Sequence, residues 1–254
     1  MSVRVILCGA CGKMGGNVLS LLENDAQAKV VCGVDLYPRE IGVPVYTSFN
    51  DVKEEADVIV DFSSPIGLVE RLEYAKTHHL GIVLAATGFS ADDLKTVDEY
   101  SKSVAIFKTA NLSLGVNLMQ ALIKTAAEVL GDSYDVEIIE RHHNLKKDAP
   151  SGTALMLADT INEAFDGKKH TVDGRSGIVG ARDKSEIGMH AVRGGTIVGE
   201  HEVMFAGEDE IITITHSARS KRVFAVGAIR AAKFLSGKAA GMYEMKDLLA
   251  EENA

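Results

Sequence analysis

The chain has 254 residues, of which 46% are hydrophobic, and its formal net charge at pH 7 is −9. A chain of this length can bury one large core or two modest ones without disulfide support. The acidic balance argues against a non-specific binder of nucleic acid or anionic membrane, so any anionic ligand must meet a local cationic pocket.

The first half of the chain alternates short apolar runs with helical patterns. Strands are expected at 3–9, 29–35, 57–62, 81–85 and 104–108, and helices at about 13–23, 65–79 and 91–102. The strands are apolar on both faces, which is typical of a parallel sheet covered by helices. The pattern predicts an α/β chain that begins with a Rossmann-type parallel-sheet domain.

A glycine-rich loop joins the first strand to the first helix. Gly9, Gly12 and Gly15 provide a tight turn, close approach of backbone to a pyrophosphate, and close helix–strand packing. Asp35 ends the second strand 20 residues after Gly15, where an acid accepts hydrogen bonds from the adenosine ribose hydroxyls. An ordinary strand–helix turn would explain two of the glycines but not the acid, so we predict dinucleotide binding.

An acid at position 35 favours NADH, because it repels the 2′-phosphate of NADPH. Lys13 and Arg39 are nearby cations that could soften this preference, but no arginine stands directly beside the acid. We therefore expect NADH to be used at least as well as NADPH.

The three cysteines are an odd count near the N-terminus, which is not a disulfide framework. Cys8 and Cys11 have the spacing of a metal or redox pair, but no further ligands recur nearby, so we expect no metal site. The N-terminus lacks a signal-peptide pattern, and no apolar run approaches the ~20 residues of a membrane span. A cytoplasmic location is the expectation.

The second half of the chain has a different pattern. A helix is expected at 114–130, a strand at 134–143 and a helix at 151–165, followed by a polar, glycine-rich excursion at 165–185 that suits a surface arm or an oligomer contact. Alternating strands at 186–195, 196–207 and 209–218 predict an antiparallel meander, and a helix follows at roughly 222–235. These elements predict a second, α+β domain with a mixed or antiparallel sheet.

The segment ERHHNLKKDAPSGTAL, residues 140–155, gathers cations and proton donors before a helix start. Ser151 is a natural N-cap, so the N–H groups of Gly152 and Thr153 are expected to point outward and form an anion site. Lys146 and the pair His142 and His143 add positive charge and proton transfer near neutral pH. A capped helix after a solvated loop is the alternative, but so many such residues in one run favour a site for a small acid.

A second histidine-containing segment, Gly199-Glu200-His201-Glu202, has residue types that could bind a metal ion. On a strand Glu200 and Glu202 share one face while His201 points the opposite way, so three of these residues cannot ligate one ion. We interpret the segment as sheet surface or subunit contact.

The segment EIIERHHNLKKDAPSGTA resembles the signature of the 4-hydroxy-tetrahydrodipicolinate reductase family. The resemblance extends to GACGKMG near the start, DFSSP at 61–65, ATGF at 86–89, ANLSLGVN at 110–117 and the run at 193–221. It implies NAD(P)H-dependent reduction of 4-hydroxy-tetrahydrodipicolinate to tetrahydrodipicolinate, with loss of water, in lysine and diaminopimelate biosynthesis. It also implies a homotetramer, a dinucleotide-binding domain at 1–113 plus 223–254, and a substrate-binding and oligomerisation domain at 114–222.

The resemblance also assigns roles to residues. It makes His142 a proton donor/acceptor and Lys146 a proton donor. The substrate-binding residues that it implies are His143, Ser151, Gly152, Thr153 and Thr87. The cofactor-binding residues are Gly9, Ala10, Cys11, Gly12, Lys13, Met14, Asp35, Ala85, Ala86, Thr87, Thr109, Ala110, Asn111 and Leu112.

Two departures from the family pattern concern the cofactor. Cys11 stands where the family commonly has glycine, and Ala85-Ala86-Thr87-Gly88 stands where it commonly has Gly-Thr-Thr-Gly. The side chain of Cys11 is expected to narrow the glycine loop. The loss of one threonine from the second segment is expected to remove one hydroxyl group near the nicotinamide.

Two other readings of the chain stay open. Another two-domain amino-acid oxidoreductase, of the aspartate or diaminopimelate dehydrogenase type, would share the glycine loop but would not require the His-His-x-x-Lys run. A nicotinamide-sensing regulator would need a basic recognition helix, which this acidic chain does not offer.

Overall fold

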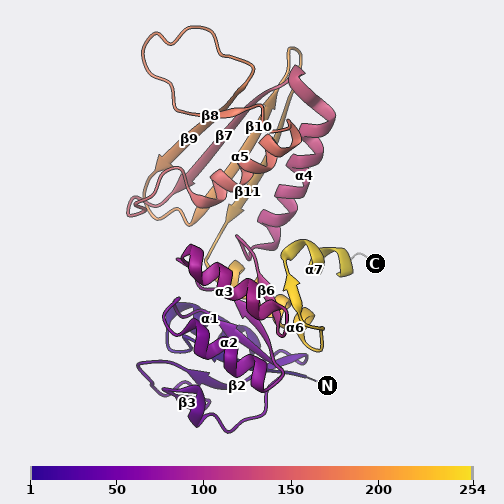
Figure 1. The fold of residues 1–254 in the computed structure, drawn as a ribbon. Coiled ribbons are helices and arrows are strands. Elements are labelled where there is room, and N and C mark those ends of the chain that lie inside the picture. The colour runs from indigo at the N-terminus through magenta and orange to yellow at the C-terminus, as the bar shows by residue number, and fades with distance from the viewer. Residues whose placement is uncertain (1, 253–254) are drawn as a thin grey trace. The chain divides into compact units, whose positions relative to one another are not determined.

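The computed structural model describes residues 2–252, and the chain divides into two compact units. One unit runs up to Ser113 and resumes at Arg222, and the other is Leu114–Lys221 (Figure 1). The second crossing between units therefore falls one residue before the expected boundary. None of the helices in the described part of the chain is long and apolar enough to cross a membrane.

The first unit is built on a seven-stranded sheet with the order β12-β6-β5-β4-β1-β2-β3, in which every neighbouring pair is parallel. Its strands are β1 (Val3–Cys8), β2 (Ala28–Val34), β3 (Val45–Tyr46), β4 (Val58–Asp61), β5 (Gly81–Leu84), β6 (Ala105–Lys108) and β12 (Gly241–Tyr243). The Rossmann-type prediction is confirmed. Strands β3 and β12 were not predicted, because two or three residues are too few to carry a periodic pattern.

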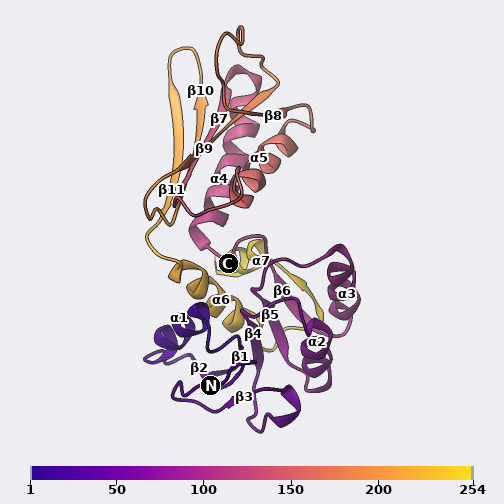
Figure 2. The same cartoon turned by 90° about the vertical axis from the view of Figure 1, so that its left-hand side faces the viewer.

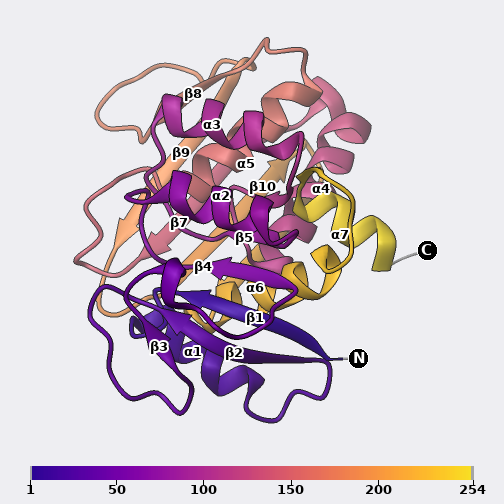
Figure 3. The ribbon, with the colours of Figure 1, turned by 60° about the horizontal axis from the view of Figure 1, so that its bottom comes forward.

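Helices cover both faces of this sheet. They are α1 (Lys13–Leu22), α2 (Leu68–Thr77), α3 (Ala91–Ser101), α6 (Arg222–Leu235) and α7 (Met245–Glu252), with a short 3-10 turn at Phe49–Asp51. Helices α1 and α6 pack together on one face of the sheet, and α2 and α3 pack together on the other face (Figure 2). Figure 3 shows α6 beside β1 and β4, so the C-terminal segment covers part of the N-terminal sheet. The same segment adds β12 to the edge of the sheet beside β6.

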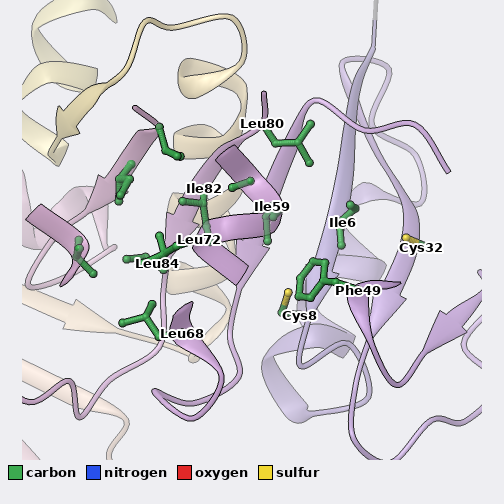
Figure 4. Close-up of a cluster of buried hydrophobic side chains, with 14 residues drawn as sticks. Ile6, Cys8, Cys32, Phe49, Ile59, Leu68, Leu72, Leu80, Ile82 and Leu84 are labelled. Carbon is green, nitrogen blue, oxygen red and sulfur yellow. The ribbon is translucent and has the colours of Figure 1, made fainter. Parts of the chain in front are cut away.

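The core of this unit comes from isoleucines that neighbouring strands place side by side. Ile6, Ile59 and Ile82 are fully buried, and they pack with Leu72 of α2 and Phe49 (Figure 4). Burying one such side chain contributes about 1.5–3 kcal/mol, so this cluster fixes the strands whose ends carry the glycine loop and Asp35.

The second unit has a five-stranded mixed sheet with the order β11-β10-β7-β9-β8. Its strands are β7 (Asp135–His142), β8 (His170–Asp173), β9 (Glu186–Arg193), β10 (Gly199–Ala206) and β11 (Ile211–Ala218). Helices α4 (Leu114–Leu130) and α5 (Gly152–Ala164) pack together, α4 also contacts β11 and α5 contacts β7, and a 3-10 turn lies at Gly131–Ser133. Alternate residues of β7 and β10 are buried against the core that includes these helices.

The predicted antiparallel meander is wrong. Only β10 and β11 form an antiparallel hairpin, and β10 pairs on its other side with β7. Strand β9 runs parallel to both β7 and β8. Alternation divides the residues of a strand between two faces, but it does not show which strand lies next to it, and β7 occupies the position between β9 and β10.

The excursion at 165–185 contains β8 and is fastened to the outer face of the sheet. Arg182 Nε lies 2.9 Å and Arg175 Nη1 3.1 Å from the Glu137 carboxylate, and His190 Nε2 lies 2.7 Å from it. Burial alone would raise the pKa of Glu137, but these hydrogen bonds lower it to about 2. The carboxylate therefore stays charged and anchors the excursion.

Candidate active site

The glycine loop adopts the tight geometry expected between β1 and α1. Gly9 has a φ of +71°, and a Cβ there would lie 2.9 Å from the carbonyl oxygen of Phe62 at the end of β4. Gly12 is the N-cap of α1, and a Cβ on Gly15 would overlap the carbonyl of Ala10. These positions exclude larger residues, so the chain can approach a ligand closely at the end of the sheet.

Asp35 lies directly after β2, where it meets the glycine loop. Its carboxylate accepts hydrogen bonds from the backbone N–H of Cys11 at 2.9 Å and of Tyr37 at 3.0 Å. The guanidinium of Arg39 contacts the Cys11 carbonyl. Asp35 and Arg39, the acid and the nearby cation noted in the sequence, therefore both contact the backbone of Cys11. The loop accommodates the cysteine at this position.

A cavity of about 370 Å³ opens beside Asp35 within the first unit. It is lined by the ends of β1 and β2 and by the segment after β4, including Gly9, Asp35, Tyr37, Ser48, Ser64 and Arg71. A pocket of this kind at the carboxyl ends of parallel strands is where such folds bind a nucleotide. The close backbone approach that Gly9 allows, the Asp35 carboxylate and this cavity together fit a dinucleotide.

No role for Arg71 was predicted from the sequence. Its partner, Asp61, lies in the DFSSP motif. Arg71 Nε is 2.8 Å from the fully buried Asp61 carboxylate, and its Nη1 donates to the Ile66 carbonyl at 2.8 Å. The buried acid ending β4 was the available signal, because a buried carboxylate needs a cation. This ion pair holds the segment that lines the cavity.

The remaining residues predicted to bind cofactor follow the next two strands. Ala85, Ala86 and Thr87 come after β5, and Thr109–Leu112 come after β6. Because the strands are parallel, these segments emerge at the same edge of the sheet as the glycine loop.

In the second unit, Glu140 is the centre of a buried polar cluster on β7. Its carboxylate lies 2.5 Å from Nδ1 of His142 and accepts from Arg193 of β9 at 2.7 and 2.8 Å. The backbone N–H of Ser151 donates to it at 3.0 Å. Burial raises the pKa of Glu140, but the hydrogen bonds from Arg193 and His142 outweigh it and hold that pKa below its usual value.

An ionised Glu140 accepts the Nδ1 proton of His142, so Nε2 is the nitrogen left for proton exchange. That nitrogen faces Gly199 of β10, where a Cβ would lie only 3.1 Å away. No role for Glu140, Arg193 or Gly199 was predicted from the sequence. Only the pairing of β7 with both β9 and β10 brings them to His142.

Ser151 caps α5, as predicted. Its Oγ accepts from the backbone N–H of Ala154 at 3.2 Å. The same Oγ lies 3.0 Å from Nε2 of His201. The helix start is therefore held by side chains from two strands of the sheet.

The interpretation of His201 as sheet surface or subunit contact is wrong, because its side chain is buried. The alternation of β10 turns it inward, opposite to Glu200 and Glu202, and Ser151 provides a polar partner there. Glu202 on the outer face pairs with Arg141 at 3.2 Å. Burial, with repulsion from His142, lowers the pKa of His201 to about 4.

Lys146 lies on the loop between β7 and α5 and is mostly shielded from solvent. Its ammonium pairs with Asp148 at 2.8 Å and lowers the pKa of that carboxyl group. It is also close enough to His201 to contribute to the lowered pKa of that ring. Backbone hydrogen bonds from Asn144 to Gly195 and from Gly194 to His142 tie this loop to the connection between β9 and β10.

The structure therefore brings together His142, Ser151 and, through the same loop, Lys146. His143 begins the loop and accepts from the Lys146 N–H through its carbonyl at 3.2 Å. All three cysteines are free thiols, and residues 2–252 contain no group of three His, Cys, Asp or Glu side chains that could hold a metal ion.

A Rossmann-type unit with a glycine loop and a ribose-position acid, together with a mixed-sheet unit carrying a histidine–lysine cluster at a helix start, defines a two-domain nicotinamide-dependent oxidoreductase. Two family models match the chain, "Dihydrodipicolinate reductase, N-terminus" over residues 3–112 and "Dihydrodipicolinate reductase, C-terminus" over residues 115–249. The chain belongs to the dihydrodipicolinate reductase family.

Curated relatives support this membership over nearly the full length. A 4-hydroxy-tetrahydrodipicolinate reductase of Caldanaerobacter subterraneus is 50% identical over 249 residues, which cover 98% of this chain and 99% of the relative. The protein of the same name from Clostridium novyi is 45% identical, with coverage of 98% and 99%. A solved dihydrodipicolinate reductase from Paenisporosarcina, bound to dipicolinate, shares the fold with a TM-score of 0.78 at 24% identity, covering 96% of this chain and 98% of that one.

Proposed function

We propose that this chain uses NAD(P)H to reduce 4-hydroxy-tetrahydrodipicolinate to tetrahydrodipicolinate, with loss of water, in lysine and diaminopimelate biosynthesis. Family membership supports the reaction, and the two family models together match residues 3–112 and 115–249. The single observation that carries the assignment of residues is the cluster in which Glu140 orients His142 and also holds the start of α5. An aspartate or diaminopimelate dehydrogenase would not require that cluster.

The start of α5 binds the substrate carboxylates in this proposal. The N–H groups of Gly152 and Thr153 lie in the first turn, where the helix dipole favours an anion, and Ser151 fixes that turn. On the preceding loop Lys146 supplies positive charge, and His143 supplies an imidazole that can bind a carboxylate. Thr87, which lies in the first unit, is assigned to the substrate by the family resemblance alone. A dianionic substrate therefore meets a local cationic site on an acidic protein.

A nicotinamide cofactor held at the glycine loop and Asp35 would supply hydride chemistry, with C4 of the substrate ring as the acceptor. Loss of the 4-hydroxyl group as water takes a proton from the neighbouring ring carbon on the imine side and leaves a C=C bond conjugated to the imine. Hydride added at C4 of that system puts an electron pair on the neighbouring carbon, which an adjacent acid must protonate. His142 is held by Glu140 with Nε2 available, and Lys146 lies on the loop that follows His142, so both are assigned as proton donors. The ammonium also stabilises charge as it develops.

NADH is used at least as well as NADPH in this proposal. Asp35 lies at the end of β2 beside the cavity, where its charge repels a 2′-phosphate, and Arg39 reaches only the Cys11 carbonyl. The Asp35→Ala substitution should raise the KM for NADH about tenfold and leave the KM for NADPH equal or lower. Steady-state kinetics with both cofactors measure this ratio, and an unchanged ratio would show that Asp35 does not contact the ribose.

A cytoplasmic homotetramer formed through the sheet of the second unit is also proposed. Three free thiols suit a reducing compartment. Arg141 and Glu202 pair on the outer face of the sheet, and Met204 shares that face. Size-exclusion chromatography with light scattering tests the oligomeric state.

The direct test of the reaction follows oxidation of NADH or NADPH with substrate generated in situ from pyruvate and aspartate semialdehyde. Substrate-dependent oxidation is expected with both cofactors. Reduction of NAD+ or NADP+ that requires an amino acid and releases ammonia would instead support the dehydrogenase alternative. No oxidation by protein that still binds NADH would contradict the proposed reaction.

A further inference from the structure

His201 of β10 is a buried polar side chain to which the proposed chemistry gives no role. It is 5% exposed and lies on the inner face of the sheet. In the strand register it stands beside Glu140 of β7 on one side and His216 of β11 on the other. A buried imidazole in this position requires a partner that compensates for lost hydration.

The contacts of His201 reach both parts of the candidate site. Its Nε2 lies 3.0 Å from Ser151 Oγ, the oxygen that caps α5. Its ring meets the ring of His142 edge-on, with centroids 5.2 Å apart and an interplanar angle of 74°. His201 therefore contacts the group that orients the substrate-binding turn and the group assigned to proton transfer.

Ser151 is held from two strands at once. Its N–H donates to Glu140 of β7 and its Oγ contacts His201 of β10. Glu140 also holds His142, so the helix start and the proton-transfer ring share one set of supports. A displacement of Ser151 would move the N–H groups of the first turn, and shifts of about 1 Å are costly in a catalytic site.

We propose that His201 is a positioning residue that sets the place of Ser151, and thereby of the anion-binding turn of α5, while its ring packs the imidazole of His142. The inference rests on the proposed substrate site at that turn. His201 acts through its hydrogen bond and its shape, since a deeply buried imidazole is neutral at physiological pH.

Two substitutions separate these contributions. His201→Phe keeps a ring against His142 but removes the hydrogen bond to Ser151. His201→Gln keeps an amide group that can hydrogen-bond Ser151 Oγ near the position of Nε2 but removes the ring. His216→Phe is the matched control, because His216 is the neighbour of His201 on the next strand.

The experiment measures KM and kcat for substrate, KM for NADH and the Kd for dipicolinate as a stable dicarboxylate probe, with Tm recorded for each variant. His201→Phe should raise the substrate KM and the dipicolinate Kd about tenfold while leaving the KM for NADH within about twofold. His201→Gln should restore the Kd to within about threefold of the unsubstituted protein, and His216→Phe should leave it unchanged.

Unchanged dipicolinate affinity in a folded His201→Phe variant would overturn the inference. Equal losses of dipicolinate affinity in His201→Phe and His201→Gln would also overturn it, because a side chain that restores the hydrogen bond to Ser151 would then not restore the anion-binding turn. An unsubstituted protein that neither turns over substrate nor binds dipicolinate would refute the proposed function itself, and with it this inference.

Discussion

At the scale of single residues, the missing side chain of Gly199 matters as much as the groups that are present. A Cβ at this position would lie 3.1 Å from Nε2 of His142, which is tighter than ordinary packing. The ring cannot easily move away, because Nδ1 is held by Glu140. Glycine at 199 therefore keeps the proton-exchanging nitrogen unobstructed.

Gly199→Ala should reduce kcat by about tenfold or more, because the added methyl displaces or covers Nε2 of His142. Gly194→Ala is the control, since a Cβ at 194 meets nothing within 4 Å and both backbones suit L residues. Steady-state kinetics compare kcat of the two variants, and Tm shows whether each variant is folded. A Gly199→Ala enzyme with the turnover of Gly194→Ala would show that the access of Nε2 does not limit catalysis.

Some residues of the second unit could be predicted from the sequence and others could not. Ser151 was recognised as a cap because capping depends on local chain chemistry. Arg193 reaches Glu140 from 53 positions away, so no local pattern could pair them. His201 was assigned to the correct strand face, but only the packed structure shows that this face is the buried one.

At the scale of elements, long periodic segments were predicted well and strand partners were not. The helix expected at 114–130 is α4, with the same bounds. The meander failed because pairing depends on tertiary contacts, and the true order inserts β7 between β9 and β10. That insertion is what places Arg193 and Gly199 on either side of His142.

Strand β10 makes the second unit sensitive to acid through His201. Burial lowers the pKa of this histidine from 6.5 to about 4, and the groups facing it are Glu140 and His142 of β7, His216 of β11 and Lys146 of the loop. The unfolded chain therefore binds a proton first as the pH falls. The stabilising effect of a neutral His201 is complete above about pH 6.5 and is lost as the pH falls towards 4.

Lowering the pH from about 7 to about 5 should cost the second unit roughly 2 kcal/mol of unfolding free energy through His201. Denaturant titrations at both values measure the cost, and His201→Gln should lack this portion of it. An identical pH dependence in the variant would mean that His201 titrates in the folded protein much as it does in the unfolded chain.

At the scale of the whole molecule, the proposed roles divide between two compact units. All residues assigned to the cofactor lie in the first unit, and apart from Thr87 those assigned to substrate and proton transfer lie in the second. The sequence predicted this division because the parallel-sheet pattern stops near Asn111 and a helical pattern begins. It could not predict that a buried network, centred on Glu140, supports the substrate side.

The most direct test of the central claim compares Lys146→Ala with Lys147→Ala in the cofactor-oxidation assay. Lys146 is largely shielded and pairs with Asp148, whereas the adjacent Lys147 is exposed. Lys146→Ala should lower kcat/KM by more than about 100-fold through loss of positive charge and of a proton donor, and Lys147→Ala should change it less than about threefold. Near-normal kinetics in a folded Lys146→Ala protein would contradict the assignment of this loop as the catalytic site.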